Sequence, residues 1–521
     1  MSSSRKLFLL ILLSPFQVAL GQDLGQVDIK GALEKRLKFI FSDEKIAKTQ
    51  VGVEVFSLSR QEFLFRMGQD LPLSPASAIK VLTGLVALKR LGPDFVFKTE
   101  VLVDGPIVNG VLQGNIYLKG GGDPSLVTER LYLMVSDLSR FEIKKVTGNI
   151  IVDDWTFDQV LYDPVRIPTK TDRAYNAPVG GISFNYNTTT VYFRPGIEKG
   201  APVKVFVEPD TGFIEVVNTA KTSKRGGSYK VVASRTEGKG KDIIRVTGEM
   251  PEGLSEQRSY FNVTSPIQYV GSAFRSMAEK SGIQFVGKEI LHREVPASAK
   301  KLTTLDSLPL REIVTLMNKF SNNFIADTLI KTLGRELKGA PGTMKKGIEV
   351  LWEESTRLNI NSAGFNVVSG SGLTRENRMT AHQFVMLMNA AYWDFDVLPE
   401  LLSSLPIAGK DGTLRSRLKG TSANGRLRAK TGSIDGVSSL VGIVQSKGGE
   451  LLAFAVLMND KSKVPGSMHP WQNYFGQALA DFNRKVPLTE RPDPIPPTLD
   501  SAKDSEADAP TENSGPRSTY D

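Results

Sequence analysis

Two side chains near residue 80 have the types and the spacing of a nucleophile and its base. Ser77 and Lys80 bound the tetrapeptide Ser-Ala-Ile-Lys, and from Ala78 to Leu91 apolar residues recur with the period of a buried helix. Side chains three residues apart lie on one helical face, so the Lys80 amine can reach the Ser77 hydroxyl and take its proton. Alone, the same pattern also fits a capping serine followed by a surface lysine. It therefore predicts covalent catalysis only in combination with further motifs.

Two more short motifs follow in the order that this chemistry needs. Ser321 and Asn323 form a Ser-x-Asn motif between two helical runs, which on its own fits an ordinary helix cap. Lys430, Thr431 and Gly432 stand just before two apolar runs that look like a hairpin, where a glycine would let a ligand lie against a strand edge. The order Ser-x-x-Lys, Ser-x-Asn, Lys-Thr-Gly matches the penicillin-recognising serine enzymes, which comprise D,D-peptidases and serine β-lactamases.

The spacing of the motifs distinguishes these two classes of enzyme. The stretch from Ser77 to Ser321 takes up nearly half of the chain, which is more than a compact β-lactamase has room for. The chain resembles the type-4 penicillin-binding proteins, the DacB family of D-alanyl-D-alanine carboxypeptidases/endopeptidases, over nearly all residues up to about 485. Beside the three motifs, the stretches that carry the resemblance are Pro75–Lys80, Leu91–Phe95, Leu118–Pro124, Leu405–Gly409, Asp411–Leu414, Arg428–Gly432 and Gly436–Ser438.

The resemblance implies a role for each motif residue. Ser77 would attack the carbonyl of a D-alanyl peptide bond and form an acyl-enzyme, with an uncharged Lys80 as its base. Ser321 would relay a proton to the leaving amine, and Asn323 would hold Lys80 and the substrate amide. The backbone N–H groups of Ser77 and Ser433 would form the oxyanion hole. The implied catalytic residues are Ser77, Lys80, Ser321, Asn323 and Lys430, and the implied substrate-binding residues are Thr431, Gly432, Ser433, Leu373 and Arg375. No metal and no organic cofactor is implied.

One loop departs from the family pattern. The family usually reads Asp-Gly-Ser-Gly-Leu-Ser before an arginine, whereas here the loop begins with Ser369 and continues to Leu373, Thr374 and Arg375. We therefore expect the loop that carries the substrate contacts Leu373 and Arg375 to be held by other interactions than in the family.

The pattern of helical and alternating segments predicts an α/β (α+β) penicillin-binding, transpeptidase-like core with an inserted domain and a nested small β domain. We expect residues 22–97 and 297–486 to form the catalytic penicillin-binding domain. Residues 98–200 and 256–296 are predicted to form the inserted domain II, and residues 201–255 the nested, β-rich domain III. The resemblance implies two inserted domains between the first and second motifs as well.

The two ends of the chain have their own compositions. Residues 1–21 combine a basic start, a short apolar run and small residues before Gln22, which predicts a signal peptide cleaved near Gly21 and a periplasmic protein. Residues 487–521 are rich in Pro, Ser, Asp and Glu and are predicted to be a disordered tail. The chain has no cysteine, which excludes a thiol nucleophile and disulfides. Its three histidines, His292, His382 and His469, are predicted to be ordinary surface or helix-face residues.

Charge and motifs together indicate the partners. A net charge of +9 favours contact with anionic polymers or an anionic membrane surface, and peripheral membrane association stays open. The basic residues are dispersed and form no nucleic-acid module, so no nucleic acid is expected. The expected partners are peptidoglycan and its D-alanyl peptides, with β-lactam antibiotics as covalent inhibitors.

Two alternatives to a D,D-peptidase remain on sequence grounds. A serine β-lactamase would use the same acylation step but would release penicillin quickly. A non-catalytic wall-binding protein that has kept the fold would bind peptidoglycan without cutting it. The sequence does not indicate whether a peptidase would prefer the terminal D-alanyl bond or a cross-link.

Overall fold

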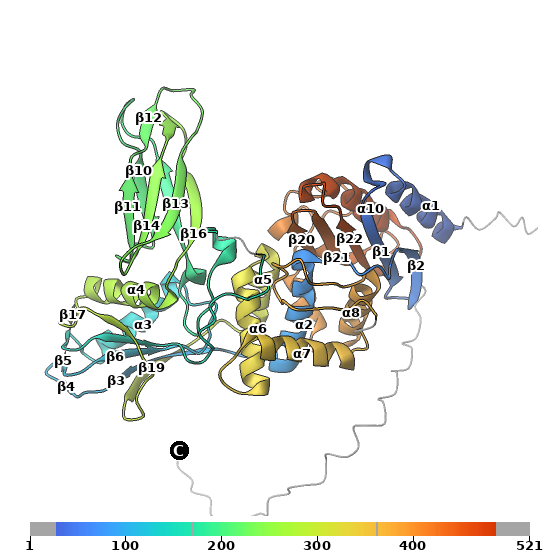
Figure 1. Cartoon of the computed structure of the whole chain (residues 1–521). Helices are drawn as coiled ribbons and strands as arrows, with labels where there is room; N and C mark the ends of the chain where they lie inside the picture. Colours follow the sequence, from blue (N-terminus) through green and yellow to red (C-terminus); the bar gives the residue numbers. More distant parts are fainter. Residues whose placement is uncertain (1–27, 168–170, 361–362, 486–521) are drawn as a thin grey trace, which may run out of the picture.

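The computed structural model describes residues 28–167, 171–360 and 363–485. The predicted signal peptide and the predicted tail therefore lie outside the described residues. Figure 1 shows a large α/β part that contains both ends of this range, and two further β-containing parts on one side of it. Within the described ranges, every helix is too short or too polar to span a bilayer.

The large part is built on a five-stranded antiparallel sheet with the order β2-β1-β22-β21-β20. Strands from the beginning and the end of the chain are direct neighbours in it, because β1 pairs with β22 along its whole length. Every residue of β21 except the last is buried, because helices cover both faces of the sheet. The strands are β1 (Gln50–Ser57), β2 (Glu62–Met67), β20 (Leu427–Ile434), β21 (Val437–Gln445) and β22 (Leu451–Asn459).

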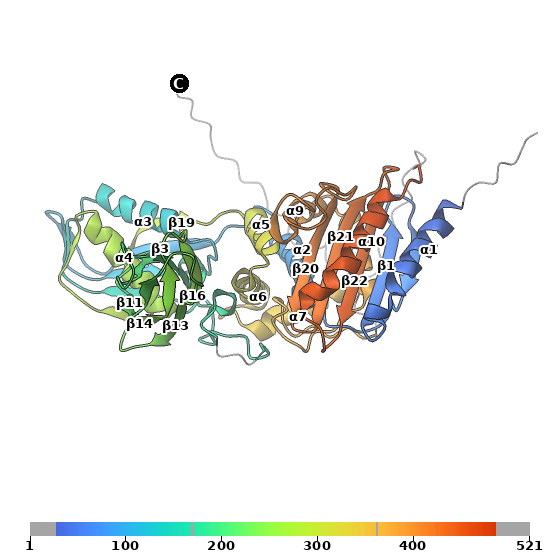
Figure 2. The ribbon, with the colours of Figure 1, turned by 90° about the horizontal axis from the view of Figure 1, so that it is seen from above.

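Helices cover both faces of this sheet, and a separate apolar core lies between the sheet and the helices on each face. Helices α1 and α10 lie along one face (Figure 2), and their core includes Leu37 and Phe475. The other face is covered by a larger cluster that includes Leu82, Leu329 and Phe384, from α2, α6 and α8. The helices of this part are α1 (Ile29–Phe41), α2 (Lys80–Leu91), α5 (Leu310–Phe320), α6 (Asn323–Lys338), α7 (Met344–Arg357), α8 (Ala381–Trp393), α9 (Leu398–Ser404) and α10 (His469–Asp481).

The chain leaves this part after α2 and forms a second layered unit. A five-stranded sheet with the order β18-β8-β6-β3-β19 packs against α3 and α4 around its own apolar core. The unit also contains a four-stranded sheet of very short strands, β17-β7-β5-β4. Its elements are β3 (Lys98–Val103), β4 (Ile107–Val108), β5 (Val111–Leu112), β6 (Ile116–Lys119), α3 (Thr128–Arg140), β7 (Lys145–Val146), β8 (Ile150–Asp153), α4 (Pro266–Lys280), β17 (Gln284–Phe285), β18 (Ile290–His292) and β19 (Lys300–Asp306).

A smaller β unit with its own core interrupts that second unit between β8 and α4. Because β9 and β16 pair with each other and β9 also pairs with β10, the small unit extends beyond residues 201–255 at both ends. We propose residues 188–262 as its bounds. Its strands are β9 (Thr188–Arg194), β10 (Lys204–Glu208), β11 (Ile214–Asn218), β12 (Lys221–Ser223), β13 (Val232–Glu237), β14 (Asp242–Thr247), β15 (Glu249–Pro251) and β16 (Gln257–Asn262).

The third motif stands before the predicted hairpin, which β21 and β22 form. The residues from Lys430 to Ser433 themselves lie inside β20, which pairs with β21 and forms the edge of the sheet. The alternation of polar and apolar residues in β20 is interrupted by the motif itself, so the strand was not recognisable by pattern. This edge strand brings the third motif next to the turn that carries Ser77.

Candidate active site

Ser77 lies in a short helical turn, Ala76–Ile79, that leads directly into α2. Lys80 is the first residue of α2 and is completely buried. Its Nζ lies 2.9 Å from Ser77 Oγ and donates a hydrogen bond of 2.7 Å to Asn323 Oδ1. It also donates to the Ser371 carbonyl oxygen. The predicted nucleophile and its predicted base are therefore in direct contact.

The second motif occupies the tight connection between α5 and α6. Ser321 has a left-handed backbone (φ 55°, ψ 38°), which ends α5 and lets the chain reverse into α6. Asn322 caps α6 with its side chain, which accepts from the Ile325 N–H. Asn323 then begins α6; its Oδ1 faces Lys80, and its Nδ2 donates a 3.0 Å hydrogen bond to the Tyr175 carbonyl of the inserted unit. The orientation of the Asn323 amide is thus set from two sides.

The third motif approaches the other two from the sheet edge. Lys430 is completely buried, and its Nζ donates to Ser321 Oγ at 2.8 Å and to the Thr431 carbonyl at 2.7 Å. A Cβ at Gly432 would lie 2.3 Å from the Pro75 carbonyl oxygen, so only a glycine lets β20 come this close to the turn of Ser77.

Burial changes the protonation of both lysines. Desolvation lowers the pKa of Lys80 from its ordinary value of 10.5 to about 7, against the opposing effect of Asp327 and with a further lowering by the positive charge of Arg166. Desolvation also lowers the pKa of Lys430 well below its usual range, and the positive charge of Lys80 lowers it further. An amine with a pKa near neutrality can act as a base at neutral pH.

The loop from Ser369 to Arg375 covers the turn of Ser77. Its Ser371 carbonyl accepts from Lys80, and a Cβ at Gly372 would lie 2.1 Å from the Ala76 carbonyl, so a glycine is required at that contact. Ser369, which stands where the family has aspartate, is buried; its backbone N–H donates to Asn377 Oδ1 at 3.1 Å, and its carbonyl accepts from Asn377 Nδ2 at 2.8 Å. An amide side chain therefore holds the start of this loop.

The two predicted contacts on this loop do not line the cavity at Ser77. The Leu373 carbonyl accepts a 3.0 Å hydrogen bond from the Ile167 N–H of the inserted unit. The Arg375 Nη1 donates to the Asp435 carbonyl at 2.9 Å, and its side chain faces a neighbouring cavity. By contrast, Ser77, Ser321, Thr431 and Ser433 meet around one cavity.

That cavity, of about 200 Å³, contains three residues that sequence reasoning did not select. It is lined by Ser77, Ser321, Thr413, Arg417, Thr431, Ser433 and His469. The hydroxyl of Thr431 donates to Thr413 Oγ1 at 2.8 Å. Thr413 lies in one of the stretches that carry the family resemblance, so a signal for it was present, whereas nothing in the spacing of Arg417 or His469 pointed to this cavity.

Arg417 is a half-buried cation that pairs with no acidic side chain among the described residues. Its Nε and Nη2 donate to Asn473 Oδ1 at 3.0 and 2.8 Å, and Nη2 also donates to Gln472 Oε1 at 3.0 Å. In the described part of the chain no carboxylate lies within ion-pair distance of it. Burial lowers the pKa of Arg417 to about 10, so the guanidinium stays charged at neutral pH. Burial, helped by this charge, lowers the pKa of His469 to about 4, so His469 is neutral there.

The inserted unit is attached to the active-site helix α6 by buried charges. Arg166 Nη2 and Asp327 Oδ2 form an ion pair of 2.6 Å in which both side chains are almost inaccessible to solvent. One turn further along α6, Lys331 Nζ pairs with Asp158 Oδ1, also at 2.6 Å. Arg166 Nη1 also donates to Asn176 Oδ1 at 3.0 Å and to the Ala177 carbonyl at 3.1 Å, next to Tyr175, whose carbonyl accepts from Asn323.

Comparison with known proteins agrees with this geometry. Residues 33–473 match the D-Ala-D-Ala carboxypeptidase 3 (S13) family. The chain belongs to this family. It is 32% identical to the D-alanyl-D-alanine carboxypeptidase of Actinomadura sp. (strain R39) over 465 residues, which cover 85% of this chain and 84% of that protein. It is 26% identical to the D-alanyl-D-alanine carboxypeptidase DacB of Haemophilus influenzae, over 86% of this chain and 94% of that protein.

A solved structure shows the same fold as this chain. The crystal structure of penicillin binding protein 4 (dacB) from Haemophilus influenzae superposes with a TM-score of 0.74 and 24% identity, covering 85% of this chain and 98% of that one. The predicted family, the predicted fold class and the predicted class of enzyme, a serine D-alanyl-D-alanine carboxypeptidase, are confirmed. The chain is an enzyme of cell-wall peptide hydrolysis, and the roles of its individual residues follow as proposals.

Proposed function

We propose that this S13 enzyme hydrolyses D-alanyl bonds of peptidoglycan, both at the ends of stem peptides and in cross-links, through an acyl-enzyme on Ser77. The observation that carries this proposal is the contact of a completely buried Lys80 with Ser77 Oγ at 2.9 Å, beside the 2.8 Å contact of Lys430 with Ser321 Oγ. The hydroxyls of Ser77 and Ser321 thus each contact one lysine amine.

Acylation begins with the transfer of the Ser77 proton to Lys80. Because its pKa is about 7, a large fraction of Lys80 is uncharged at neutral pH and can accept this proton. Ser77 Oγ then bonds to the carbonyl carbon, and the carbonyl oxygen becomes an oxyanion. The backbone N–H groups of Ser77 and Ser433 stabilise this oxyanion, an effect worth about 3 to 4 kcal/mol per donor.

Breakdown of the tetrahedral intermediate needs a proton on the leaving amine. The Ser321 hydroxyl gives its proton to that amine and takes up in return the proton that Lys80 removed from Ser77, so that Lys80 is uncharged again. Lys430 donates to Ser321 Oγ and holds this hydroxyl in place. The C–N bond then breaks, and an ester between Ser77 and the acyl part remains. Water attacks this ester in the second half of the reaction, with Lys80 again as the base, and Ser77 is restored.

The leaving part of the substrate carries a carboxylate next to the scissile amide, and the cavity offers a matching charge. Thr431 and Thr413 provide hydroxyl donors, and Arg417 provides a guanidinium that has no acidic partner among the described residues. A carboxylate would satisfy this cation. In a D-alanyl cross-link to the D-centre of a diamino acid, a carboxylate occupies the corresponding position, which supports both carboxypeptidase and endopeptidase activity.

We also propose that the protein is exported, with cleavage near Gly21, and acts in the periplasm. The support is the character of residues 1–21 and the cell-wall substrate of the family. β-Lactams are the expected covalent inhibitors of Ser77; penicillin binding protein 4 of Haemophilus influenzae has been crystallised with a β-lactam.

Digestion of purified muropeptides by the wild type and by Ser77→Ala tests nucleophile, substrate and bond together. We expect the wild type to release D-alanine and to cleave dimeric muropeptides, and Ser77→Ala to do neither. Mass spectrometry after exposure to penicillin should find a persistent adduct on Ser77. Rapid turnover of penicillin without an adduct would instead identify a β-lactamase. Binding to sacculi without any cleavage would identify a non-catalytic wall-binding protein.

A further inference from the structure

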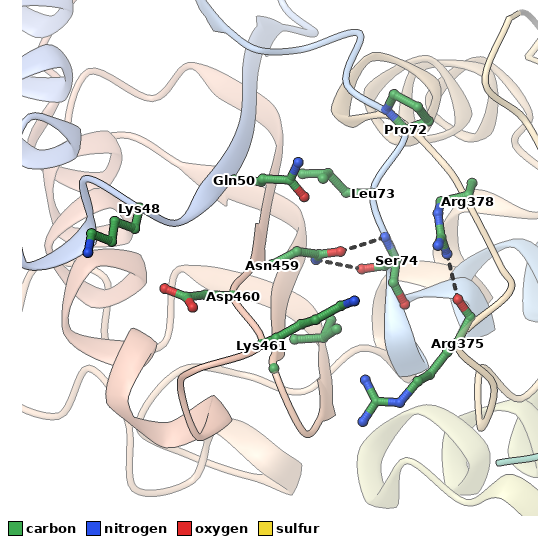
Figure 3. A pocket seen from close by; sticks show the side chains of 12 residues that line it. Lys48, Gln50, Pro72, Leu73, Ser74, Arg375, Arg378, Asn459, Asp460 and Lys461 are labelled. Carbon is green, nitrogen blue, oxygen red and sulfur yellow. Dashed lines mark hydrogen bonds between the residues drawn. The ribbon is translucent and has the colours of Figure 1, made fainter. Parts of the chain in front are cut away.

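A second cavity, of about 550 Å³, lies beside the active site at the ends of the central strands. Its walls come from three places: the start of β1 with the segment before Ser77, the loop that carries Arg375 and Arg378, and the ends of β20 and β22. We call it the strand-end cavity. Figure 3 shows Lys461 reaching from the end of β22 toward Ser74, with Arg375 and Arg378 on the other side of Ser74.

The strand-end cavity is basic, and its basic groups lack acidic partners. Four of its lining residues are cations, Lys48, Arg375, Arg378 and Lys461, and only Asp460 is acidic. In the part of the chain that the structure describes, none of the four has a carboxylate within ion-pair distance. The Asp460 carboxylate accepts from Thr49 Oγ1 at 2.9 Å and from the Ser462 hydroxyl at 2.6 Å, and Figure 3 shows it directed away from Ser74.

Ser74 adds an unused hydrogen-bond donor to this wall. The residue is 5% exposed, and its Oγ has no hydrogen-bond partner among the described residues. The backbone of Ser74 is held independently of this hydroxyl, because Asn459 Oδ1 accepts from its N–H at 2.9 Å and Asn459 Nδ2 donates to its carbonyl at 3.0 Å. A buried hydroxyl without a partner destabilises a protein unless a ligand supplies the missing bond.

The position of the cavity follows the direction of the substrate. In the proposed binding mode, the carboxylate of the leaving group lies at Thr431 and Arg417. The reacting carbonyl lies between Ser77 and Ser433. The acyl part of the substrate then continues along β20 toward the end of this strand at Ile434. The turn after β20, at Gly436, lines the strand-end cavity. Ser74 lies three residues before Ser77, and three extended residues span at most about 10 Å. The next residues of a stem peptide therefore reach this cavity.

We propose that the strand-end cavity binds a free carboxylate on the acyl side of the stem peptide, with Lys461 and the Ser74 hydroxyl as its ligands beside Arg375. The carboxylate of the γ-linked D-glutamate, two residues before the D-alanine at the scissile bond, has the required charge and distance. This inference rests on the proposed function, because it uses the direction of the substrate in the cleft.

The test compares two synthetic pentapeptides that end in D-Ala-D-Ala, carry lysine as their third residue, and differ only in a free carboxylate or a carboxamide at the D-glutamate. Release of D-alanine is measured for the wild type, Lys461→Ala, Ser74→Ala and the control Lys447→Ala. Lys447 is an exposed lysine in the β21–β22 turn, at the opposite end of the strands. The rate of acylation by penicillin and the unfolding midpoint are measured for the same proteins.

We expect Lys461→Ala to raise KM for the free-carboxylate peptide about fivefold, as for one solvent-accessible ion pair. Lys461→Ala should leave kcat, the KM of the carboxamide peptide and the rate of penicillin acylation unchanged. The control Lys447→Ala should leave every measured quantity unchanged. Ser74→Ala should raise the same KM while leaving the unfolding midpoint unchanged or higher, because it removes an unpartnered hydroxyl. In the wild type, the carboxamide peptide should have the higher KM.

Two results would overturn this assignment. The first is an equal KM of both peptides in the wild type, or an equal change for both in Lys461→Ala. The second is a wild type that does not discriminate between the two peptides but is inhibited by a glycerol-phosphate polymer, with this inhibition lost in Lys461→Ala. That result would assign the cavity to the phosphates of a wall polymer. A wild type that neither releases D-alanine nor reacts with penicillin contradicts the proposed function itself and is thereby distinguished from a failure of this site.

Discussion

Lys80 Nζ lies 2.9 Å from Ser77 Oγ while two carbonyl-type oxygens, Asn323 Oδ1 and the Ser371 carbonyl, accept its hydrogens. Both of those oxygens can only accept. An uncharged amine has two hydrogens, so when both are donated to these acceptors its lone pair is left for the hydroxyl hydrogen of Ser77. The surroundings of Lys80 thus orient the neutral amine as a base, and burial lowers its pKa so that this form exists near neutral pH.

The first prediction concerns the pH dependence of acylation. Because the pKa of Lys80 is lowered to about 7, the uncharged base is present above this pH and is lost below it. The second-order rate of penicillin acylation should therefore be constant at alkaline pH and fall about tenfold per unit below about pH 7. Stopped-flow acylation between pH 5 and 9 measures it. A rate that stays constant down to pH 5, or an inflection near the ordinary lysine value, would exclude Lys80 as the base.

The second prediction concerns Arg417. Arg417→Gln keeps a polar side chain but removes the charge that we assign to the substrate carboxylate. We expect kcat/KM for D-alanyl-D-alanine peptides to fall about 10- to 100-fold, as for the loss of one charge-assisted hydrogen bond. A peptide with a C-terminal carboxamide, a poorer substrate of the wild type, should be unaffected by the substitution. Arg415→Gln, at an exposed arginine two residues away, is the control. Equal losses for both peptides would show that Arg417 has only a structural role.

The third prediction tests the close approach of the sheet edge to the nucleophile. Gly432→Ala places a Cβ 2.3 Å from the Pro75 carbonyl oxygen, so β20 must move away from the turn of Ser77. Acylation by penicillin should become at least about 100-fold slower, because the oxyanion donor of Ser433 moves with the strand. Gly466→Ala is the matched control, since its Cβ would have no atom within 4 Å. Unchanged acylation in Gly432→Ala would contradict the proposed oxyanion hole.

The fourth prediction concerns the ion pair between the inserted unit and α6. Arg166→Ala leaves Asp327 buried without its counter-ion, which should lower the free energy of unfolding by about 3 to 5 kcal/mol. The double variant Arg166→Ala/Asp327→Asn removes both charges and should recover much of this loss. Thermal unfolding of the three proteins measures the effect. A double variant as unstable as the single one would show that the destabilisation does not come from the unpaired charge.

Several parts of this enzyme were predictable because the information is local. Helix α2 follows from its apolar period, and the three motifs are short strings with a defined order, so the family could be inferred, and a candidate nucleophile and base named, from the sequence alone. The bounds of the small β unit were not predictable to the residue, because β9 and β16 join it by pairing with each other across nearly 70 residues of chain, and such long-range pairing leaves no local signal.

The amino-acid sequence by itself determined which side chains have the chemistry: a hydroxyl and an amine one helical turn apart, and two further motifs that carry proton donors. Only the tertiary structure decided that Arg417 and His469 share their cavity, that Ser371 supplies a carbonyl to Lys80, and that a basic cavity lies at the ends of the central strands. The physical reason is that hydrogen bonds, burial and pKa values depend on which distant segments pack together, and packing places residues hundreds of positions apart within 3 Å of one another.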